Sequence, residues 1–111
     1  MRLYIAGPIT GTDDFQAAFS NAAKDLREAG YDVRNPAAIS PDAAMEKRRP
    51  RDTSWQMWMR VTTAMLATCD GVALLPGWRA SRGAMVEADW AEAIGLPVME
   101  IDDWLEERRY A

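Results

Sequence analysis

Two short apolar runs constrain the fold of this chain more than any other feature of its sequence. Residues 3–6 form the first run, which ends at Gly7-Pro8. Residues 71–75 form the second run, which ends at Pro76-Gly77. A strand with one solvated face alternates apolar and polar residues, whereas a strand buried on both faces is continuously apolar. Both runs therefore predict buried strands of a sheet that carries helices on its two faces.

The first helix is predicted between these runs. Apolar residues recur at helical spacing over 15–29, and Gly30 follows where a C-cap glycine belongs. Thr12 or Asp13 is the expected N-cap. The alternating segment 31–34 comes next and predicts a strand at the sheet edge.

A second helix is predicted just before the second apolar run, with Thr53 or Ser54 as its cap. Its apolar stripe is interpreted as core. The stripe consists of Trp55, Trp58, Met59, Thr62, Met65, Leu66 and Cys69. Thr62 is its hydroxyl-bearing member, so this side chain either bonds within its own helix or faces a ligand.

A third helix, capped by Ser81 and ended by Gly95, is expected to pack on the sheet through Val86, Trp90 and Ile94. A last strand over 97–101 and a terminal helix over 104–109 complete the pattern. Strands that alternate with helices predict a single α/β domain spanning residues 1–111. We expect a small three-layer Rossmann- or flavodoxin-like fold, with a parallel sheet of about four strands in the order 2-1-3-4.

The segment 36–53 separates the edge strand from the second helix and carries three prolines. A loop of this length is usually mobile or functional, although a short helix at 41–47 is compatible with the sequence. Its basic residues allow a phosphate site or, as the favoured interpretation, a solvated loop. These residues are Lys47, Arg48, Arg49 and Arg51.

Composition excludes several classes of function. With one cysteine, Cys69, and no histidine, the chain has no internal disulfide, no Ser-His or Cys-His triad, and no ordinary zinc site. We expect neither metal nor cofactor. The net charge of −4 argues against nucleic acid as a partner. Since the sequence has no signal peptide and no apolar run near the roughly 20 residues of a membrane span, we expect a cytoplasmic protein.

The topology predicts where a ligand would bind. In a parallel sheet of this order, ligands bind beyond the carboxyl ends of the strands where the order reverses, here between the first and third strands. Segments 7–12 and 76–83 would line that crevice, and each leads into a helix whose free N–H groups suit an anion such as phosphate. The glycines of these loops allow a close approach of backbone to ligand, although any strand-to-helix turn favours glycine.

Glu87 is the most specific candidate in this region. It would lie in the second turn of the helix capped by Ser81, where the helix dipole favours a carboxylate. Its helical neighbours Gly83, Ala84 and Ala91 are small and leave space for a substrate. The alternative is an ordinary surface glutamate.

Several of these segments resemble one family over nearly the whole chain. The segments are 3–11, Asn35-Pro36, Cys69-Asp70, 75–78 and 81–84, followed by Glu87. They look like the small phage and bacterial proteins of the DUF4406 family, which are similar to nucleoside 2-deoxyribosyltransferases and to deoxynucleoside monophosphate N-glycosidases. The link to the enzymes rests on the Tyr4 strand and on the Ser-x-Gly-x-x-x-Glu spacing from Ser81 to Glu87.

The resemblance implies cleavage of an N-glycosidic bond, or 2-deoxyribosyl transfer, with Glu87 as the nucleophile. It implies that Tyr4 orients Glu87 by a hydrogen bond, although Tyr4 also fits an ordinary core position. The 5′ end of the substrate would be held by Ser81, Gly83 and the 9–11 loop. The full set expected to bind substrate is Gly7, Pro8, Ile9, Gly11, Gly77, Trp78, Ser81, Arg82 and Gly83.

One departure from the enzymes affects the expected activity. They carry an aspartate where this chain has Thr62, and threonine cannot ionise to bind sugar or to handle the proton of the leaving base. Asp13, Asp14 or Asp52 would have to substitute. The alternative function is therefore a nucleotide-binding module with weak or no turnover. Either function implies a nucleoside or nucleotide as partner, and we expect no membrane partner. The enzymes that the chain resembles assemble as dimers or larger, so the resemblance implies a homo-oligomer of two or more copies.

Overall fold

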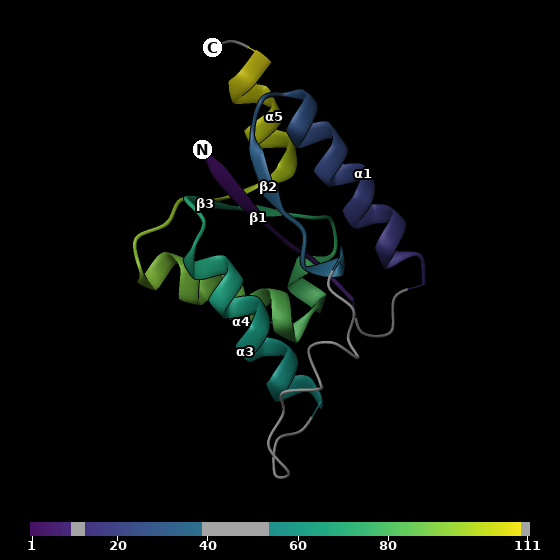
Figure 1. Ribbon diagram of the computed structural model, residues 1–111, viewed down its shortest axis with the longest axis vertical. Helices are drawn as coiled ribbons and strands as arrows, with labels where there is room; N and C mark the ends of the chain where they lie inside the picture. Colours follow the sequence, from purple (N-terminus) through teal and green to yellow (C-terminus); the bar gives the residue numbers. More distant parts are fainter. Residues whose placement is uncertain (10–12, 39–53, 110–111) are drawn as a thin grey trace.

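The computed structural model describes residues 1–9, 13–38 and 54–109, which form a four-stranded parallel sheet covered by helices (Figure 1). The strand order is β2-β1-β3-β4, so the predicted α/β class and order 2-1-3-4 are confirmed. Along the chain the strands and helices are β1 (Arg2–Ala6), α1 (Phe15–Glu28), β2 (Asp32–Arg34), α3 (Ser54–Ala67), β3 (Gly71–Leu74), α4 (Arg82–Ala93), β4 (Val98–Glu100) and α5 (Ile101–Arg109). Short 3-10 turns occupy Pro36–Ala38 and Trp78–Ala80.

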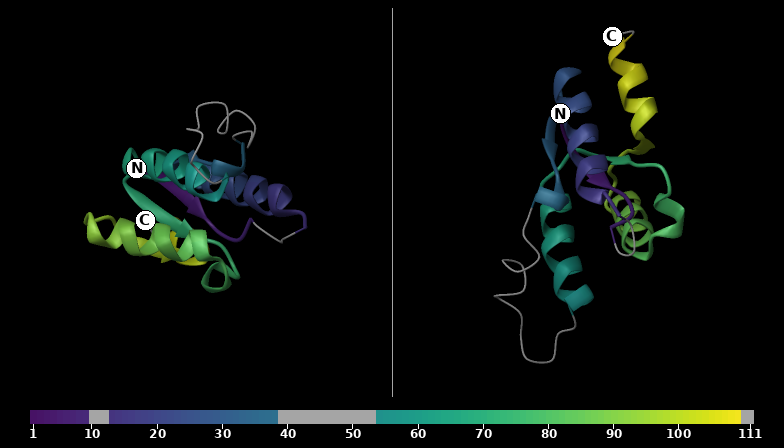
Figure 2. Two further views of the ribbon diagram at one scale, coloured as in Figure 1. Left: turned by 90° about the horizontal axis from the view of Figure 1, so that it is seen from below. Right: turned by 90° about the vertical axis from the view of Figure 1, so that its right-hand side faces the viewer.

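The two faces of β1 pack against different helices, which explains its continuous apolar sequence. Leu3 and Ile5 lie in one core with α1 and α5, which run side by side in Figures 1 and 2. Tyr4 and Ala6 point to the opposite face and lie in a second core with α3 and α4. All four side chains are at most 1% exposed, as expected of a central strand in a sheet with both faces covered.

The end of α1 follows the prediction, but its start does not. Gly30 has a φ of +99°, and the N–H of Tyr31 donates to the carbonyl of Leu26 at 3.1 Å, which makes a glycine C-cap. The N-cap is Asp14 instead of Asp13 or Thr12, and its side chain makes no capping hydrogen bond. Asp14 has a left-handed φ of 57°, so a turn of the backbone sets the start of this helix.

The last strand is shorter than predicted and the last helix is longer. Strand β4 covers only Val98–Glu100, and α5 begins at Ile101 instead of Trp104. Asp102 and Asp103 lie in the first turn of α5, where carboxylates favour the positive end of the helix dipole. The indole of Trp104 is buried and donates to the carbonyl of Val72 at 2.8 Å, which ties α5 to β3.

The packing face predicted for α4 is wrong. Val86, Trp90 and Ile94 are 41%, 37% and 46% exposed. The buried face consists of Ala84, Glu87, Ala88 and Ala91. Alanines allow the helix to approach the sheet closely, and this close approach directs the large apolar side chains outward.

Several predictions lie outside the described residues. They are the short helix at 41–47, the basic residues 47–51, the side chains of Thr53 and Ser54, the loop residue Gly11, and Thr12 and Asp52. Within the described ranges, no helix is long and apolar enough to cross a membrane.

Candidate functional site

The centre of the site is a hydrogen bond between the middle of the sheet and α4. The hydroxyl of Tyr4 donates to Oε2 of Glu87. Tyr4 is fully buried, and Glu87 is only 6% exposed. Tyr4 therefore belongs to the core and also contacts the carboxylate that the resemblance pairs it with.

Local structure explains how these two side chains meet. Tyr4 pairs with Arg34 of β2 and with Val72 of β3, so hydrogen-bonded neighbours on both sides fix its backbone. On α4, the predicted cap is present, because Ser81 Oγ accepts the N–H of Ala84 at 3.3 Å. The cap starts the helix at Arg82, and the helical repeat then directs Glu87 toward the sheet.

Burial changes the acid–base properties of both side chains. It raises the pKa of Glu87 from its usual value of 4.5 to about 7, although hydrogen bonds from Tyr4 and Thr62 lower it in part. Burial and the nearby Glu87 charge hold the pKa of Tyr4 well above its usual value. The phenol thus stays protonated as a donor at neutral pH, while the carboxyl group exchanges its proton near pH 7.

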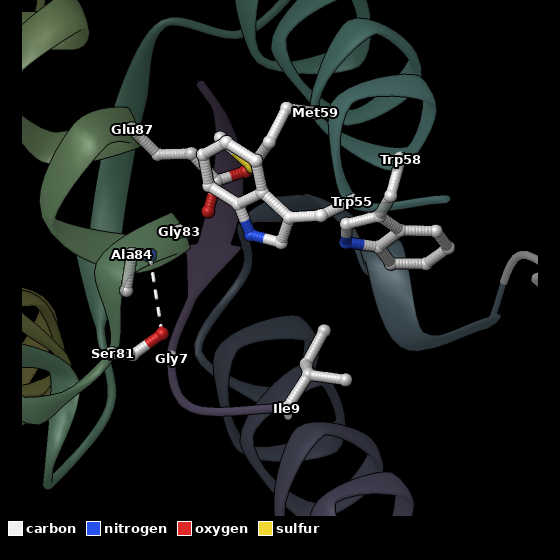
Figure 3. Close-up of a pocket in the computed structure, with 9 residues that line it drawn as sticks. All are labelled: Gly7, Ile9, Trp55, Trp58, Met59, Ser81, Gly83, Ala84 and Glu87. Carbon is white, nitrogen blue, oxygen red and sulfur yellow. Dashed lines mark hydrogen bonds between the residues drawn. The ribbon is translucent and has the colours of Figure 1, made fainter. Parts of the chain in front are cut away.

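Glu87 lines a pocket that three parts of the chain enclose (Figure 3). The loop after β1, the start of α3 and the start of α4 contribute its walls. The lining residues are Gly7, Ile9, Trp55, Trp58, Met59, Ser81, Gly83, Ala84 and Glu87. The cavity itself has a volume of about 30 Å³, well below the roughly 300–1,000 Å³ of typical small-molecule sites.

One wall of the pocket is aromatic. Figure 3 shows the Glu87 side chain directed from α4 toward the indole of Trp55 and the side chain of Met59. The guanidinium of Arg82 lies over the Trp55 ring, 4.2 Å from its centroid. At Gly83 an added Cβ would lie 3.4 Å from Met59 Sδ, so glycine permits the close approach of α3 and α4. A carboxyl group therefore faces a flat apolar surface, an arrangement suited to a ring-containing ligand.

The structure brings only part of the predicted substrate-binding set to this pocket. Gly7, Ile9, Ser81 and Gly83 line it. Four other described members of the set do not line the pocket: Pro8, Gly77, Trp78 and Arg82.

These other positions have structural surroundings of their own. Gly77 adopts a left-handed turn with a φ of +85°, next to Pro8. Trp78 packs against the core on the Tyr4 face of the sheet. Gly7 also serves packing, since an added Cβ would lie 2.9 Å from Cβ of Leu75.

The sequence analysis missed the wall formed by Trp55, Trp58 and Met59, which it placed in the core stripe of α3. The stripe was the only available signal, and it does not distinguish a core from the lining of a pocket. The exposed fractions differ along it, because Trp55 and Trp58 are half-buried whereas Leu66 is fully buried.

Neither described candidate to replace the aspartate that the resembling enzymes carry at the position of Thr62 lines the pocket. Asp13 and Asp14 are exposed before α1. Of the nine residues that line the pocket, only Glu87 ionises near neutral pH. In the part of the chain that the structure describes, no cluster of three His, Cys, Asp or Glu side chains is placed to hold a metal ion.

One comparison with known proteins gives a result. The model of a family described as "Domain of unknown function (DUF4406)" matches residues 1–100. None of the curated proteins matches the chain.

Proposed function

The chain belongs to the DUF4406 family, and we propose that it cleaves the N-glycosidic bond of a nucleoside or nucleotide in the cytoplasm, by hydrolysis or by 2-deoxyribosyl transfer. One observation carries the proposal: a buried carboxyl group, Glu87, is held by Tyr4 at the wall of a pocket. Burying a carboxyl group costs stability even when a hydrogen bond offsets part of the cost. A buried carboxyl group beside a pocket is therefore a candidate for a functional residue.

The proposed reaction has two steps. An oxygen of ionised Glu87 attacks the anomeric carbon, and the C–N bond breaks with its electron pair leaving on the base. A water then attacks the same carbon, which releases the sugar and regenerates the carboxylate. A second base in place of water gives transfer. Among the residues that line the pocket, Glu87 is the one acid, and it serves as the nucleophile. The departing base therefore takes its proton from water.

Tyr4 supports this reaction by orienting the nucleophile. Its hydroxyl donates to Oε2 of Glu87 and so holds one oxygen of the carboxylate in place. Its backbone is fixed within the sheet, so the phenol holds the carboxylate in one place before substrate binds.

The aromatic wall supports a base-containing substrate. The ring of Trp55 offers a surface on which a nucleobase can stack, and base–aromatic stacking contributes about 1–3 kcal/mol per base. Ser81 and Gly83 lie at the other side of the pocket, at the start of α4, where the resemblance places the 5′ end of the substrate.

The test is the release of free base. The protein is incubated at high concentration with a panel of deoxynucleosides and their 5′-monophosphates, and the products are separated by chromatography. We expect base release from at least one substrate, its loss in Glu87→Gln, and its retention in Glu92→Gln. Glu92 is an exposed residue of α4 and controls for the loss of a charge from the same helix. No release from any substrate contradicts the proposal.

A second candidate function is nucleotide binding without turnover. It is favoured by Thr62 in place of the family aspartate and by the lack of another acid among the residues lining the pocket. Thermal unfolding with a nucleotide panel tests it, since a ligand at about 100 times its Kd adds about 2.7 kcal/mol to stability. Stabilisation without base release supports this alternative, and the absence of any shift contradicts it.

We also propose that copies of the chain associate. The observation in favour is the group of apolar side chains that α4 exposes, including Val86, Trp90 and Ile94. Light scattering at assay concentration tests the proposal, and the mass of a single chain would contradict it.

A further inference from the structure

Thr62 lies behind the Tyr4–Glu87 pair, on α3. It is completely buried, and its hydroxyl is near enough to both members of the pair to lower the pKa of each. Three elements thus meet at Glu87: β1 through Tyr4, α4 through Glu87 itself, and α3 through Thr62.

The hydroxyl of Thr62 has one hydrogen, and the carbonyl of Met59 and the carboxylate of Glu87 compete for it. Within its own helix it faces the carbonyl of Met59 at 3.4 Å, which is long for a hydroxyl donor. The hydroxyl of Thr63 donates to the same carbonyl at 2.6 Å. The Met59 carbonyl therefore already has a strong side-chain donor and does not require the hydrogen of Thr62.

An ionised Glu87 is the better acceptor for that hydrogen. Hydrogen bonds to a charged acceptor are roughly twice as strong as those between neutral groups. An aspartate at position 62 would instead place a second carboxyl group against Glu87, and two close carboxylates cannot both ionise easily. Threonine supplies a donor there without adding a charge.

We propose that Thr62 is a positioning residue, whose hydroxyl gives the Glu87 carboxylate a second hydrogen bond beside that of Tyr4 and fixes its orientation toward the pocket. The role in catalysis rests on the proposed function, whereas the hydrogen bond itself is measurable without turnover. Thr62 accordingly acts through Glu87 and does not replace the family acid in transferring a proton.

The test is a pH titration of Glu87. It is monitored by NMR of the carboxyl carbons in protein labelled at glutamate, and the signal that is missing in Glu87→Gln is assigned to Glu87. Thr62→Val removes the hydroxyl with little change of shape, and we expect the midpoint to rise by about one pH unit or more. Thr62→Ser keeps the donor and should keep the midpoint. The matched control is Thr68→Val, which removes an exposed hydroxyl that donates to the carbonyl of Met65 and should also leave the midpoint unchanged.

An unchanged midpoint in Thr62→Val overturns the proposal, and so does an equal rise in Thr68→Val. If the valine variant does not fold, Thr62→Ala removes the same hydroxyl without adding a methyl group in its place. The midpoint should rise in this variant too, and an unchanged midpoint overturns the proposal. In the base-release assay, Thr62→Val should lower kcat more than it changes KM. A wild-type protein that releases no base contradicts the proposed function alone, because the titration decides the role of Thr62 by itself.

Discussion

Replacing Glu87 with glutamine should stabilise the protein at alkaline pH and have little effect at acid pH. The folded state raises the pKa of Glu87 from 4.5 to about 7, so between these values the folded protein holds a proton that the unfolded chain has lost. The free energy of unfolding of the wild type therefore falls as pH rises through this window. Glutamine has the same shape, accepts the Tyr4 hydrogen bond and does not titrate.

The magnitude follows from the size of the shift. One pKa unit corresponds to about 1.4 kcal/mol, so ionising Glu87 in the folded protein costs about 3 kcal/mol. We expect the pH-dependent gain of Glu87→Gln to be below about 1 kcal/mol at pH 5 and about 3 kcal/mol at pH 8. For a chain of this length, the gain at pH 8 corresponds to about 10 °C in Tm.

Urea unfolding at a series of pH values between 5 and 9 measures this difference. The midpoint should shift while the slope stays the same, which marks a change in stability alone. Glu92→Gln on the exposed side of α4 should change stability by less than about 0.5 kcal/mol at every pH. A Glu87→Gln gain that is the same at pH 5 and pH 8, or no gain at pH 8, would refute the reasoning.

Two further predictions concern activity and packing. Base release should increase with pH through a midpoint near 7, because only ionised Glu87 attacks; a rate that falls over this range in a kcat/KM profile contradicts that role. Gly7→Ala should cost about 1–3 kcal/mol in urea unfolding, because the new Cβ would lie 2.9 Å from Cβ of Leu75; wild-type stability would show that this contact relaxes without cost.

The architecture could be predicted because its strongest signals are local. Residues 3–6 and 71–75 are apolar without interruption and are bounded by glycine and proline, a pattern typical of strands covered on both faces. Gly30 and Gly95 both adopt left-handed φ values at helix ends, where a side chain would be strained. The start of α1 was less predictable, since Asp14 caps it through a backbone turn and not through a side-chain hydrogen bond.

The orientation of α4 could not be predicted from hydrophobicity. Large apolar residues usually indicate the buried face of a helix, and Val86, Trp90 and Ile94 gave that signal. Here α4 meets the sheet through three alanines and Glu87, which allow a close approach that the larger apolar residues would prevent. The small residues around Glu87 made it a candidate in the sequence, and the structure places Glu87 on the wall of the pocket.

The pocket wall on α3 depends on tertiary structure that the sequence does not show. Trp55 and Met59 continue the same stripe as the fully buried Leu66. The position at which the helix crosses the strands decides which part of the stripe meets the sheet and which part extends past it. The contact between Thr62 and the Tyr4–Glu87 pair likewise joins three elements far apart in the sequence.

The placement of Tyr4 on a central strand has a consequence for how this family can diversify. The Glu87 carboxylate is anchored by a residue that neighbouring strands immobilise, whereas the indole wall is carried by the first turns of a separate helix. Exchanging Trp55 or Trp58 would therefore alter which rings the pocket admits and leave the anchor intact. If the proposed function holds, selection can adjust ligand choice on one segment while the carboxylate on another stays in place.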